Sequence, residues 1–480
     1  MAGLLTMKRL FQLACCLTLA GAFALMGATA NAPGSITLNN LPGNCTLTLE
    51  SRFEDGAGVR VHFAAADRSF ALKVLNAAVS AYEMLTRLGF NTPGFSFASP
   101  DPDYAQDPDR TLDIYLGGNG PSFRDAPCFD ALKVSETGYE AMILLPARYK
   151  DFIRNWERLN PSFLGRRDID TDLRGTLAHE MLHAILFYCN KNLEKDSAGA
   201  SKRLDWYVEG LARYAETFAG ARHDFYSQGF KQVLPDRVRF SRGGANYYMR
   251  YPDQPFRELR YENALFWRFM DTRFGMAAIG RLSRELRGAD TNPAAAFERS
   301  TGRKWGRFLG DYARAVLTGD FALGPDAGHL KPVARTMLVI GRKGFELIDG
   351  YGLRKKLGRV CSTDWVGSWH DRRARFGGPA AGGDATEQAD LAAWATDFIE
   401  FTPEDGSRAI GIRHCRGGAG LLVQWAAELE SGKRLEGHLG TIPPGQSRRW
   451  RMDRLPAVKK AYLLLTTLDP EQPSEYQLTV

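Results

Sequence analysis

The segment 174–189, RGTLAHEMLHAILFYC, decides how this chain is interpreted. It contains His179 and His183 four residues apart, with Glu180 directly after the first histidine. On an α-helix four residues turn through about 400°, so both imidazoles face the same way and can bind one metal ion. Glu180 lies about 100° around the helix from His179, close enough to reach a water molecule on that metal. The segment therefore predicts a metal-binding helix.

The order of these residue types predicts zinc chemistry. Zinc lowers the pKa of a water molecule that it binds to roughly 7, and it polarises a carbonyl group. A carboxylate beside that water can take its proton, which produces a hydroxide able to attack the carbonyl carbon. His179 and His183 are thus predicted zinc ligands, and Glu180 is the predicted general base. The alternative is a pair of core histidines that fall one turn apart beside an exposed glutamate.

A catalytic zinc needs a third protein ligand, and Glu209 is the candidate. It lies in WYVEGLARYAE, residues 206–216, on a second helix predicted over residues 203–220. An antiparallel pair of helices would bring Glu209 to the metal. Gly210 and Ala212 beside it permit the close approach of two helices that this requires. The alternative is an ordinary charged glutamate on the surface.

Together the two segments resemble the gluzincin metallopeptidases, a group with collagenase-like and aminopeptidase-like members. Their third zinc ligand is a glutamate on the helix after the His-Glu-x-x-His helix, often within Trp-x-x-Glu-Gly-x-Ala-x-Tyr. The residues that match this second pattern are Trp206, Glu209, Gly210, Ala212 and Tyr214. The order of elements is similar over residues 55–320, although the specific motifs lie only between His179 and Tyr214. The resemblance implies a zincin-like, two-lobed fold with zinc bound by His179, His183 and Glu209.

The chain departs from the gluzincin pattern beside the third ligand. Many gluzincins carry an acidic residue four positions after the ligand glutamate, where it orients the first histidine. This chain has Arg213 at that position. Glu216, seven residues after Glu209, lies on nearly the same helix face and is the candidate for the orienting role. The alternative for Glu216 is a solvated surface carboxylate.

The resemblance also implies a residue that donates a hydrogen bond to the developing oxyanion. Tyr261 is favoured, because it begins a helix predicted over residues 261–275, at a separation from Glu209 similar to that in related enzymes. A buried structural tyrosine is the alternative. Further candidates are Tyr247, Tyr248, Tyr251 and His223. By the same resemblance, the predicted strand 111–118 would be an edge strand that pairs with an extended substrate.

Periodicity predicts an α+β fold with three regions after a short N-terminal segment. Residues 31–165 are predicted to form an α/β lobe with a small mixed sheet. Residues 166–330 are predicted to form a helical, zinc-binding lobe, and residues 331–480 an antiparallel β-sandwich-like domain. The elements predicted in the first lobe are strands 59–63, 111–118 and 139–146 and a helix over residues 70–88. The role of the β-domain stays open among carbohydrate binding, protein binding and a chaperone-like function.

Residues 1–30 have the pattern of a secretory signal peptide. Two basic residues precede an uncharged apolar stretch, and Ala28 and Ala30 form a small-residue cleavage site. Cleavage after Ala30 predicts a secreted or periplasmic protein without a stable membrane span, and an uncleaved anchor is the alternative. Export favours disulfides among the cysteines that remain, and we expect one bridge from Cys361 to Cys415.

Composition and charge exclude several classes of protein. The chain has 480 residues with 62 basic and 55 acidic side chains, a net charge of +7, and its basic residues are spread among acidic ones. A mixed surface of this kind does not predict nucleic-acid binding. With 44% hydrophobic residues and no long biased tract, the chain is globular and neither fibrous nor disordered.

These observations predict a secreted zinc endopeptidase that acts on a protein or peptide substrate. No aminopeptidase signature precedes His179, which favours an endopeptidase over an aminopeptidase. One alternative is a secreted binding or surface protein in which the zinc helix is structural or inactive. Another is a metal-dependent hydrolase of non-peptide amides or esters. The sequence leaves the oligomeric state open.

Overall fold

The computed structural model divides the chain into two units, Met1–Leu159 with Asp172–Lys202 and Asn160–Thr171 with Arg203–Val480. The described residues are 45–54, 56–90, 111–117, 128–133, 139–159, 169–189, 204–219, 263–286, 292–318, 337–341, 344–348, 354–357, 364–366, 396–401, 409–469, 472 and 474–479. The units differ from the predicted boundaries, because most of the histidine helix clusters with the N-terminal sheet and the later helices cluster with the C-terminal strands. The predicted signal segment lies outside the described residues, and no helix within them is long and apolar enough to cross a membrane.

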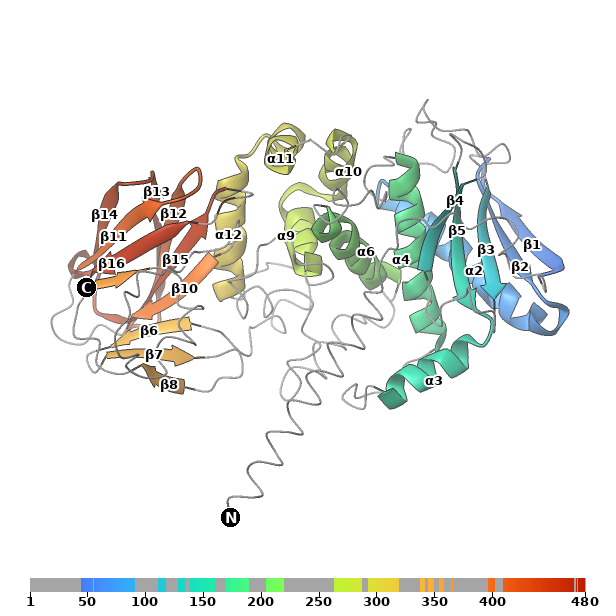
Figure 1. The fold of residues 1–480 in the computed structure, drawn as a ribbon, viewed down its shortest axis with the longest axis horizontal. Helices are drawn as coiled ribbons and strands as arrows, with labels where there is room; N and C mark the ends of the chain where they lie inside the picture. Colours follow the sequence, from blue (N-terminus) through green and yellow to red (C-terminus); the bar gives the residue numbers. More distant parts are fainter. Residues whose placement is uncertain are drawn as a thin grey trace, which may run out of the picture. The chain divides into compact units, whose positions relative to one another are not determined.

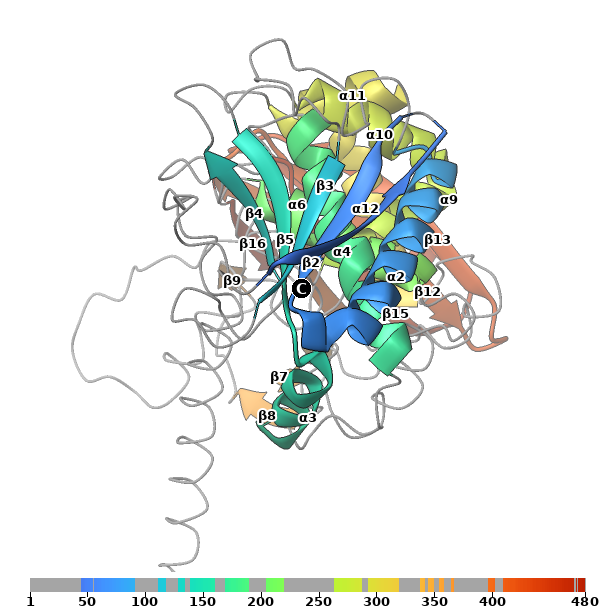
Figure 2. The same cartoon turned by 90° about the vertical axis from the view of Figure 1, so that its right-hand side faces the viewer.

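A five-stranded mixed sheet forms the centre of the first unit, in the order β1-β2-β3-β5-β4 (Figure 2). Its strands are β1 (Leu47–Arg52), β2 (Gly58–Phe63), β3 (Thr111–Gly117), β4 (Cys128–Lys133) and β5 (Tyr139–Pro146). β2, β3 and β5 run parallel, while β1 and β4 pair antiparallel at the two edges. The three predicted strands are confirmed as β2, β3 and β5. β1 is largely exposed, so it lacks the apolar alternation that would predict it.

The expectation that residues 111–118 form an edge strand is wrong. β3 is the central strand, with Ile114 opposite Val61 of β2 on one side and Ile143 of β5 on the other. Its backbone donors and acceptors are therefore used within the sheet and cannot pair with a substrate. The edges of this sheet are β1 and β4.

The helix α2 (Arg68–Arg87) packs against β1 and β2, as Figure 2 shows. Its buried residues recur at helical spacing, and they include Ala71, Val74, Ala78 and Leu85. Alanines at this interface let the helix lie close to the sheet, where Val59 and Val61 are fully buried. The helix ends before Gly89, which has a positive φ of 89° and so permits the chain to leave the helix. The predicted helix over 70–88 is confirmed.

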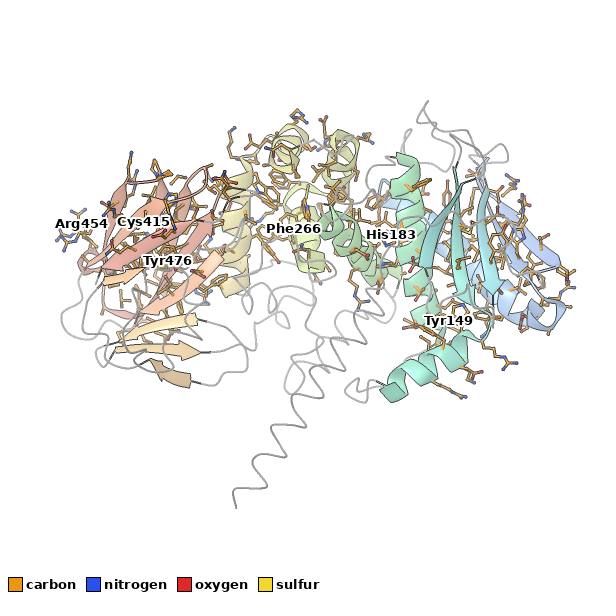
Figure 3. All side chains as sticks on the ribbon, viewed as in Figure 1. Tyr149, His183, Phe266, Cys415, Arg454 and Tyr476 are labelled. Carbon is orange, nitrogen blue, oxygen red and sulfur yellow. The ribbon has the colours of Figure 1, made fainter. Side chains whose placement is uncertain are left out.

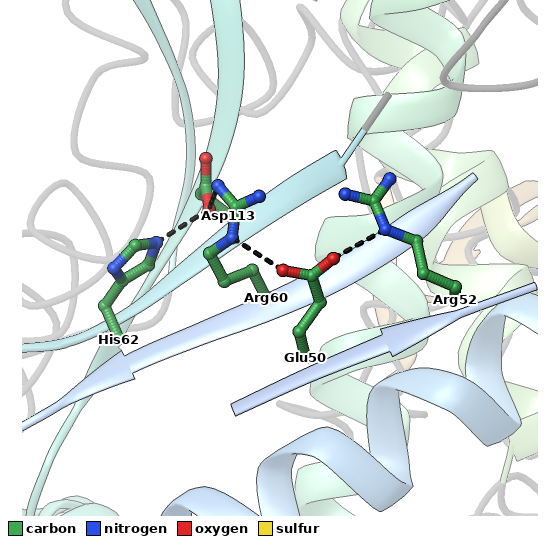
Figure 4. A network of polar contacts seen from close by, with 5 residues as sticks. All are labelled: Glu50, Arg52, Arg60, His62 and Asp113. Atoms are coloured by element: carbon green, nitrogen blue, oxygen red, sulfur yellow. Dashed lines mark hydrogen bonds and ion pairs between the residues drawn. The ribbon is translucent and has the colours of Figure 1, made fainter. Parts of the chain in front are cut away.

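A polar network joins the three strands at one side of this sheet (Figure 4). Asp113 Oδ1 of β3 lies 2.7 Å from His62 Nε2 and 3.4 Å from an Arg60 nitrogen, both on β2. Glu50 of β1 accepts hydrogen bonds from Arg60 and Arg52 at 3.1 and 2.5 Å. Burial opposes the charge of Glu50, but these two arginines hold the pKa of its carboxyl below the usual value. The network aligns β1 with its neighbours through charges that are half exposed, so its contribution to stability is small.

Two further helices belong to the region after β5. They are α3 (Tyr149–Leu159) and α4 (Ile169–Cys189). α3 and residues 172–189 of α4 belong to the first unit. α4 begins at Ile169, before the segment 174–189 that predicted it, so Asp170 and Thr171 lie in its first turn. An aspartate in the first turn still interacts favourably with the helix dipole.

The described residues between 205 and 318 form helices of the second unit (Figure 1). They are α6 (Asp205–Ala219), α9 (Ala264–Phe274), α10 (Met276–Glu285), α11 (Pro293–Thr301) and α12 (Trp305–Thr318). Trp206 of α6 stacks on Trp267 of α9 with ring centroids 5.5 Å apart, and Phe266 and Trp305 lie beside them. This buried aromatic cluster supplies the core that fixes α6.

Two sheets form the C-terminal part of the second unit. The first has the strand order β13-β12-β15-β10-β6-β7-β8, and the second has the order β14-β11-β16-β9. The first sheet contains β6 (Met337–Gly341), β7 (Gly344–Ile348), β8 (Arg354–Leu357), β10 (Thr396–Phe401), β12 (Leu421–Leu429), β13 (Arg434–Ile442) and β15 (Val458–Thr467). The second contains β9 (Asp364–Val366), β11 (Ala409–Arg416), β14 (Ser447–Arg451) and β16 (Glu475–Thr479).

The two sheets share one hydrophobic core, to which both contribute buried side chains. Ile412 of β11 and Leu478 of β16 meet Val423 of β12 and Leu463 of β15 in this core. The predicted antiparallel β-rich region is confirmed with one exception, since β6 and β10 pair in parallel. Cys415 is a free thiol, so the expected bridge to Cys361 is not formed; Cys361 lies outside the described residues.

The helix α12 lies against β12 and β15, as Figure 1 shows. Glycines make this contact possible. A Cβ on Gly310 would come within 2.5 Å of Gln424 Oε1 and of a Leu422 methyl carbon, and one on Gly306 would collide with Leu468. Helix and sheet therefore approach more closely than any larger residue would allow.

Gly310→Ala is expected to lower the free energy of unfolding by about 1–3 kcal/mol, because the added methyl overpacks the contact with β12. In a helix interior alanine is more favourable than glycine by about 1 kcal/mol, so helix propensity alone predicts that the variant is more stable. A loss of stability therefore indicates that the added methyl is overpacked. Urea unfolding monitored by circular dichroism measures it. Asp311→Ala, on the same helix with a partly exposed side chain, is the control and should change stability by less than about 1 kcal/mol. A stabilised Gly310→Ala would contradict the close approach.

Candidate metal site

The helix α4 brings His179 and His183 together. Their Nε2 atoms lie 3.1 Å apart, and their ring centroids are 4.8 Å apart with the planes at 63°. Two nitrogens that bind one zinc at about 2.0–2.1 Å with tetrahedral angles would be about 3.3 Å apart. The spacing of the two imidazole nitrogens therefore fits a shared metal ion. Figure 3 shows His183 on α4.

Glu180 belongs to the same group. One of its carboxylate oxygens and the ligand nitrogens of His179 and His183 all lie within 4.8 Å of one another. Among the described residues this is the one group of three or more histidine, cysteine or acidic side chains with such spacing. The geometry agrees with the prediction that His179 and His183 face the same way and that Glu180 lies within reach of the same point. Two imidazole nitrogens beside a carboxylate are groups that can hold a metal ion.

The surroundings of this group are apolar. His179 and His183 are each 7% exposed and Glu180 is 9% exposed. From Leu177 to Phe187 every residue of α4 is buried, whichever side of the helix it occupies. Three ionisable groups in such a helix lose much of their hydration, which is costly unless they bind one another, a proton or a metal ion. A metal ion bound by the two imidazoles, with the carboxylate beside it, would be one way to stabilise the group.

A second polar contact holds the same helix. Tyr149, at the start of α3, donates a hydrogen bond to Asp172 Oδ2 at 2.5 Å, and its hydroxyl lies 2.8 Å from Thr176 Oγ1. Asp172 and Thr176 precede His179 by seven and three residues, so all three lie on one side of α4. Sequence reasoning missed this contact, although the spacing of the polar residues along α4 was visible. The contact fixes α4 against α3 on the side that carries the histidines; Figure 3 labels Tyr149.

Tyr149→Phe is expected to lower the free energy of unfolding by about 1–3 kcal/mol, because it removes a hydrogen bond to the buried Asp172 carboxylate. Thermal or urea unfolding measures the change. In the double variant with Asp172→Asn the two effects should not add, and the coupling should be about 0.5–3 kcal/mol. Additive effects would show that the hydroxyl and the carboxylate act independently.

The predicted third ligand, Glu209, is a half-buried residue of α6. The residues that surround it in the sequence motif have clear roles within the second unit. Trp206 stacks on Trp267, and Tyr214 donates a hydrogen bond to Asp271 Oδ2 at 2.7 Å. Both contacts attach α6 to α9. Glu209 and the histidines belong to different units, so its approach to them stays a prediction.

Two acidic residues near Glu209 have partners of their own. Glu216 accepts a hydrogen bond from Arg213, one turn away on α6, so the arginine that replaces the usual acidic residue is charge-paired. The orienting role predicted for Glu216 stays a prediction. Asp271 is partly buried, and this burial raises the pKa of its carboxyl even though Tyr214 donates to it.

The chain matches no protein-family model and no curated protein sequence. The resemblance to gluzincins therefore rests on the motif residues of α4 and α6 alone.

Several other predicted residues lie outside the described part of the chain. They are Tyr261, Tyr247, Tyr248, Tyr251 and His223. His414, which the sequence does not connect with the metal site, is fully buried in the second unit and its Nδ1 lies 2.9 Å from the Ile442 carbonyl oxygen. That contact gives His414 a structural role in the β-sheets.

Proposed function

We propose that this protein is a zinc-dependent endopeptidase, exported by its N-terminal segment, with His179 and His183 as two zinc ligands. The observation that supports this proposal is the 3.1 Å separation of the two Nε2 atoms on a buried helix, with the Glu180 carboxylate in the same group. Two core histidines would need no ionisable glutamate beside them in an apolar environment. Two imidazoles that bind a cation, with a carboxylate beside them to accept a proton, give each of the three groups a role.

Glu209 is the proposed third ligand. It follows on the next long helix after α4, and its motif neighbours Trp206 and Tyr214 fix the position of α6 within its unit. A glutamate from a second helix would complete a three-residue set and leave a fourth position open, as catalytic zinc requires. Gly210 and Ala212 are buried and small, which favours close packing on the side of α6 that carries them.

The chemistry of hydrolysis assigns a role to Glu180. Zinc, when bound, polarises a carbonyl group and lowers the pKa of water to about 7. The Glu180 carboxylate takes a proton from the attacking water and returns it to the nitrogen of the leaving amine. The apolar residues around α4 keep bulk water away, which strengthens each of these electrostatic interactions. Tyr261 is the proposed donor to the developing oxyanion.

A peptide substrate needs a strand edge, and β4 offers one. β4 pairs with β5 on one side, and no described strand pairs with its other side. An extended peptide can add to such an edge through backbone hydrogen bonds. β4 thus takes the role that the sequence led us to expect for residues 111–118.

The test combines metal content with hydrolysis. Elemental analysis of the purified full chain should find about one zinc per molecule. Hydrolysis of casein and of a peptide library should stop when a chelator removes the metal and return when zinc is added. Ester and non-peptide amide substrates are assayed in parallel. If the protein binds zinc and hydrolyses only esters, the function is that of a metal-dependent esterase and not of a peptidase. If it binds zinc and hydrolyses none of the substrates, a binding protein is favoured. The absence of zinc would overturn the proposal.

A further inference from the structure

Arginines gather on the smaller sheet of the second unit. β14 has the sequence SRRWR, and its Arg448, Arg449 and Arg451 are exposed while Trp450 is buried. The neighbouring strand β11 contributes the exposed Arg413. Figure 3 labels Arg454, three residues after Arg451, and Cys415 of β11 in this part of the unit. The sequence gives no hint of the grouping, because Arg413 lies more than thirty residues from β14.

The strand register places three of these residues on one face. Arg413 is opposite Ser447, Gly411 is opposite Arg449, and Ala409 is opposite Arg451. Directly paired residues share a face of the sheet, and the intervening Ile410, Ile412 and Trp450 point into the core. Arg413, Arg449 and Arg451 therefore lie together on the outer face. We call these three residues the arginine face.

The spacing within the arginine face is regular. Arg449 and Arg451 are two residues apart on one strand, a distance of about 6.8 Å, and Arg413 is displaced by the same step along the neighbouring strand. Gly411 and Ala409, opposite two of the arginines, are too small to cover them. Arg413 of β11 is paired with Ser447 of β14 on one side and with Gln477 of β16 on the other. These two residues add uncharged hydrogen-bonding groups beside the arginine.

Arg413 and Arg449 differ from nearby basic residues, which are paired with carboxylates. The two lysines that follow on β15 are paired, Lys459 with Glu428 at 3.0 Å and Lys460 with Glu400 at 3.1 Å. No ion pair joins Arg413 or Arg449 to an acidic side chain in the described part of the chain. Arginine is the side chain best suited to bind planar or tetrahedral anions through paired hydrogen bonds.

We infer that the arginine face binds an acidic polysaccharide, a polymer with regularly spaced carboxylate or sulfate groups. A membrane is disfavoured, since the large exposed apolar side chains of the described residues are Leu47 and Leu72, both in the other unit. A nucleic acid is disfavoured because the aromatic residue of β14, Trp450, is only 3% exposed and stacks on Trp425 inside the core. Three arginines on one face of the sheet, with Ser447 and Gln477 on either side of Arg413, suit an extended, charged sugar chain. The inference does not depend on the metal site.

The experiment measures binding of the full chain to dextran sulfate, polygalacturonate and uncharged dextran by isothermal titration calorimetry, at about 0.1 M NaCl where the Debye length is about 10 Å. The triple variant Arg413→Ser, Arg449→Ser, Arg451→Ser should bind the charged polymers at least tenfold more weakly, since hydrogen bonds to charged groups are strong. The same three positions changed to lysine should retain part of the affinity, because charge remains while paired hydrogen bonds are lost.

The matched control removes the same charge elsewhere in the unit. The variant Lys433→Ser, Arg434→Ser, Lys459→Ser changes three exposed positions and should bind within about twofold of wild type, because only screened long-range charge is lost. Preference for the sulfated or the carboxylated polymer identifies the anion, and either preference supports the inference. Equal loss in the control, tighter binding of a single-stranded oligonucleotide, or no binding to either charged polymer would overturn it.

Discussion

Glu180→Gln is expected to lower peptide hydrolysis by about 10²- to 10⁴-fold while the protein keeps its zinc, because an amide of the same shape cannot accept the proton of the attacking water. Glu180 is 9% exposed on a helix that is buried on all sides, so an isosteric replacement avoids a new cavity. The measurement is kcat/KM on a peptide substrate, with metal content determined on the same sample. Unchanged zinc with lost hydrolysis would separate a role in proton transfer from a role in metal binding.

The control for this variant is Glu285→Gln, which removes a carboxylate from a surface pair with Arg299 in the second unit. Its activity should equal that of the wild type, and its stability should change by less than about 1 kcal/mol. Full activity of Glu180→Gln would show that this carboxylate is not the base, even if the metal is present.

His183→Ala is expected to weaken zinc binding by more than about 100-fold, because loss of a ligand must cost more than loss of an outer partner of a ligand. Hydrolysis should disappear with the metal. A second readout does not depend on activity: zinc at about 100 times its Kd should stabilise the wild type by about 2.7 kcal/mol and raise its Tm, whereas the variant should show no such shift.

His62→Ala is the matched control, since it removes a histidine from the same unit at a site that contacts Asp113 and not the other histidines. It should bind one zinc and keep the zinc-dependent rise in Tm. If the His183→Ala protein still binds one zinc with wild-type affinity, His183 is not a zinc ligand, and His179 and His183 are core residues. A similar loss in His62→Ala would indicate a general defect of the unit.

The sequence predicted the helices around the site well. α4 and α6 lie within a few residues of their predicted limits, because apolar side chains at helical spacing cover long segments of both. The approach of His179 and His183 also follows from local geometry, since residues one turn apart on a helix face the same way, and Glu180 lies next to His179 in the sequence. These features involve contacts over at most four residues.

Strand neighbours were harder to predict. The sequence of β3 is compatible with an edge or a central strand, and only pairing with β2 and β5 decided between them. α10 follows α9 across Gly275, a separate helix that the sequence analysis did not predict. The expected bridge from Cys361 to Cys415 depended on the distance between two residues far apart in the sequence, which no local pattern specifies.

The sequence by itself determined the helix that carries His179, Glu180 and His183, the helical character of the described segments between residues 205 and 318, and the β-rich character of the C-terminal region. Helix periodicity and strand alternation are properties of short segments, so composition and spacing are enough to show them. The tertiary structure alone decided the contact of Tyr149 with Asp172, the close packing of Gly310 on β12 and the arginine face. Each joins residues more than twenty positions apart, and such contacts depend on strand register and on how the whole core packs, which no short segment of sequence specifies.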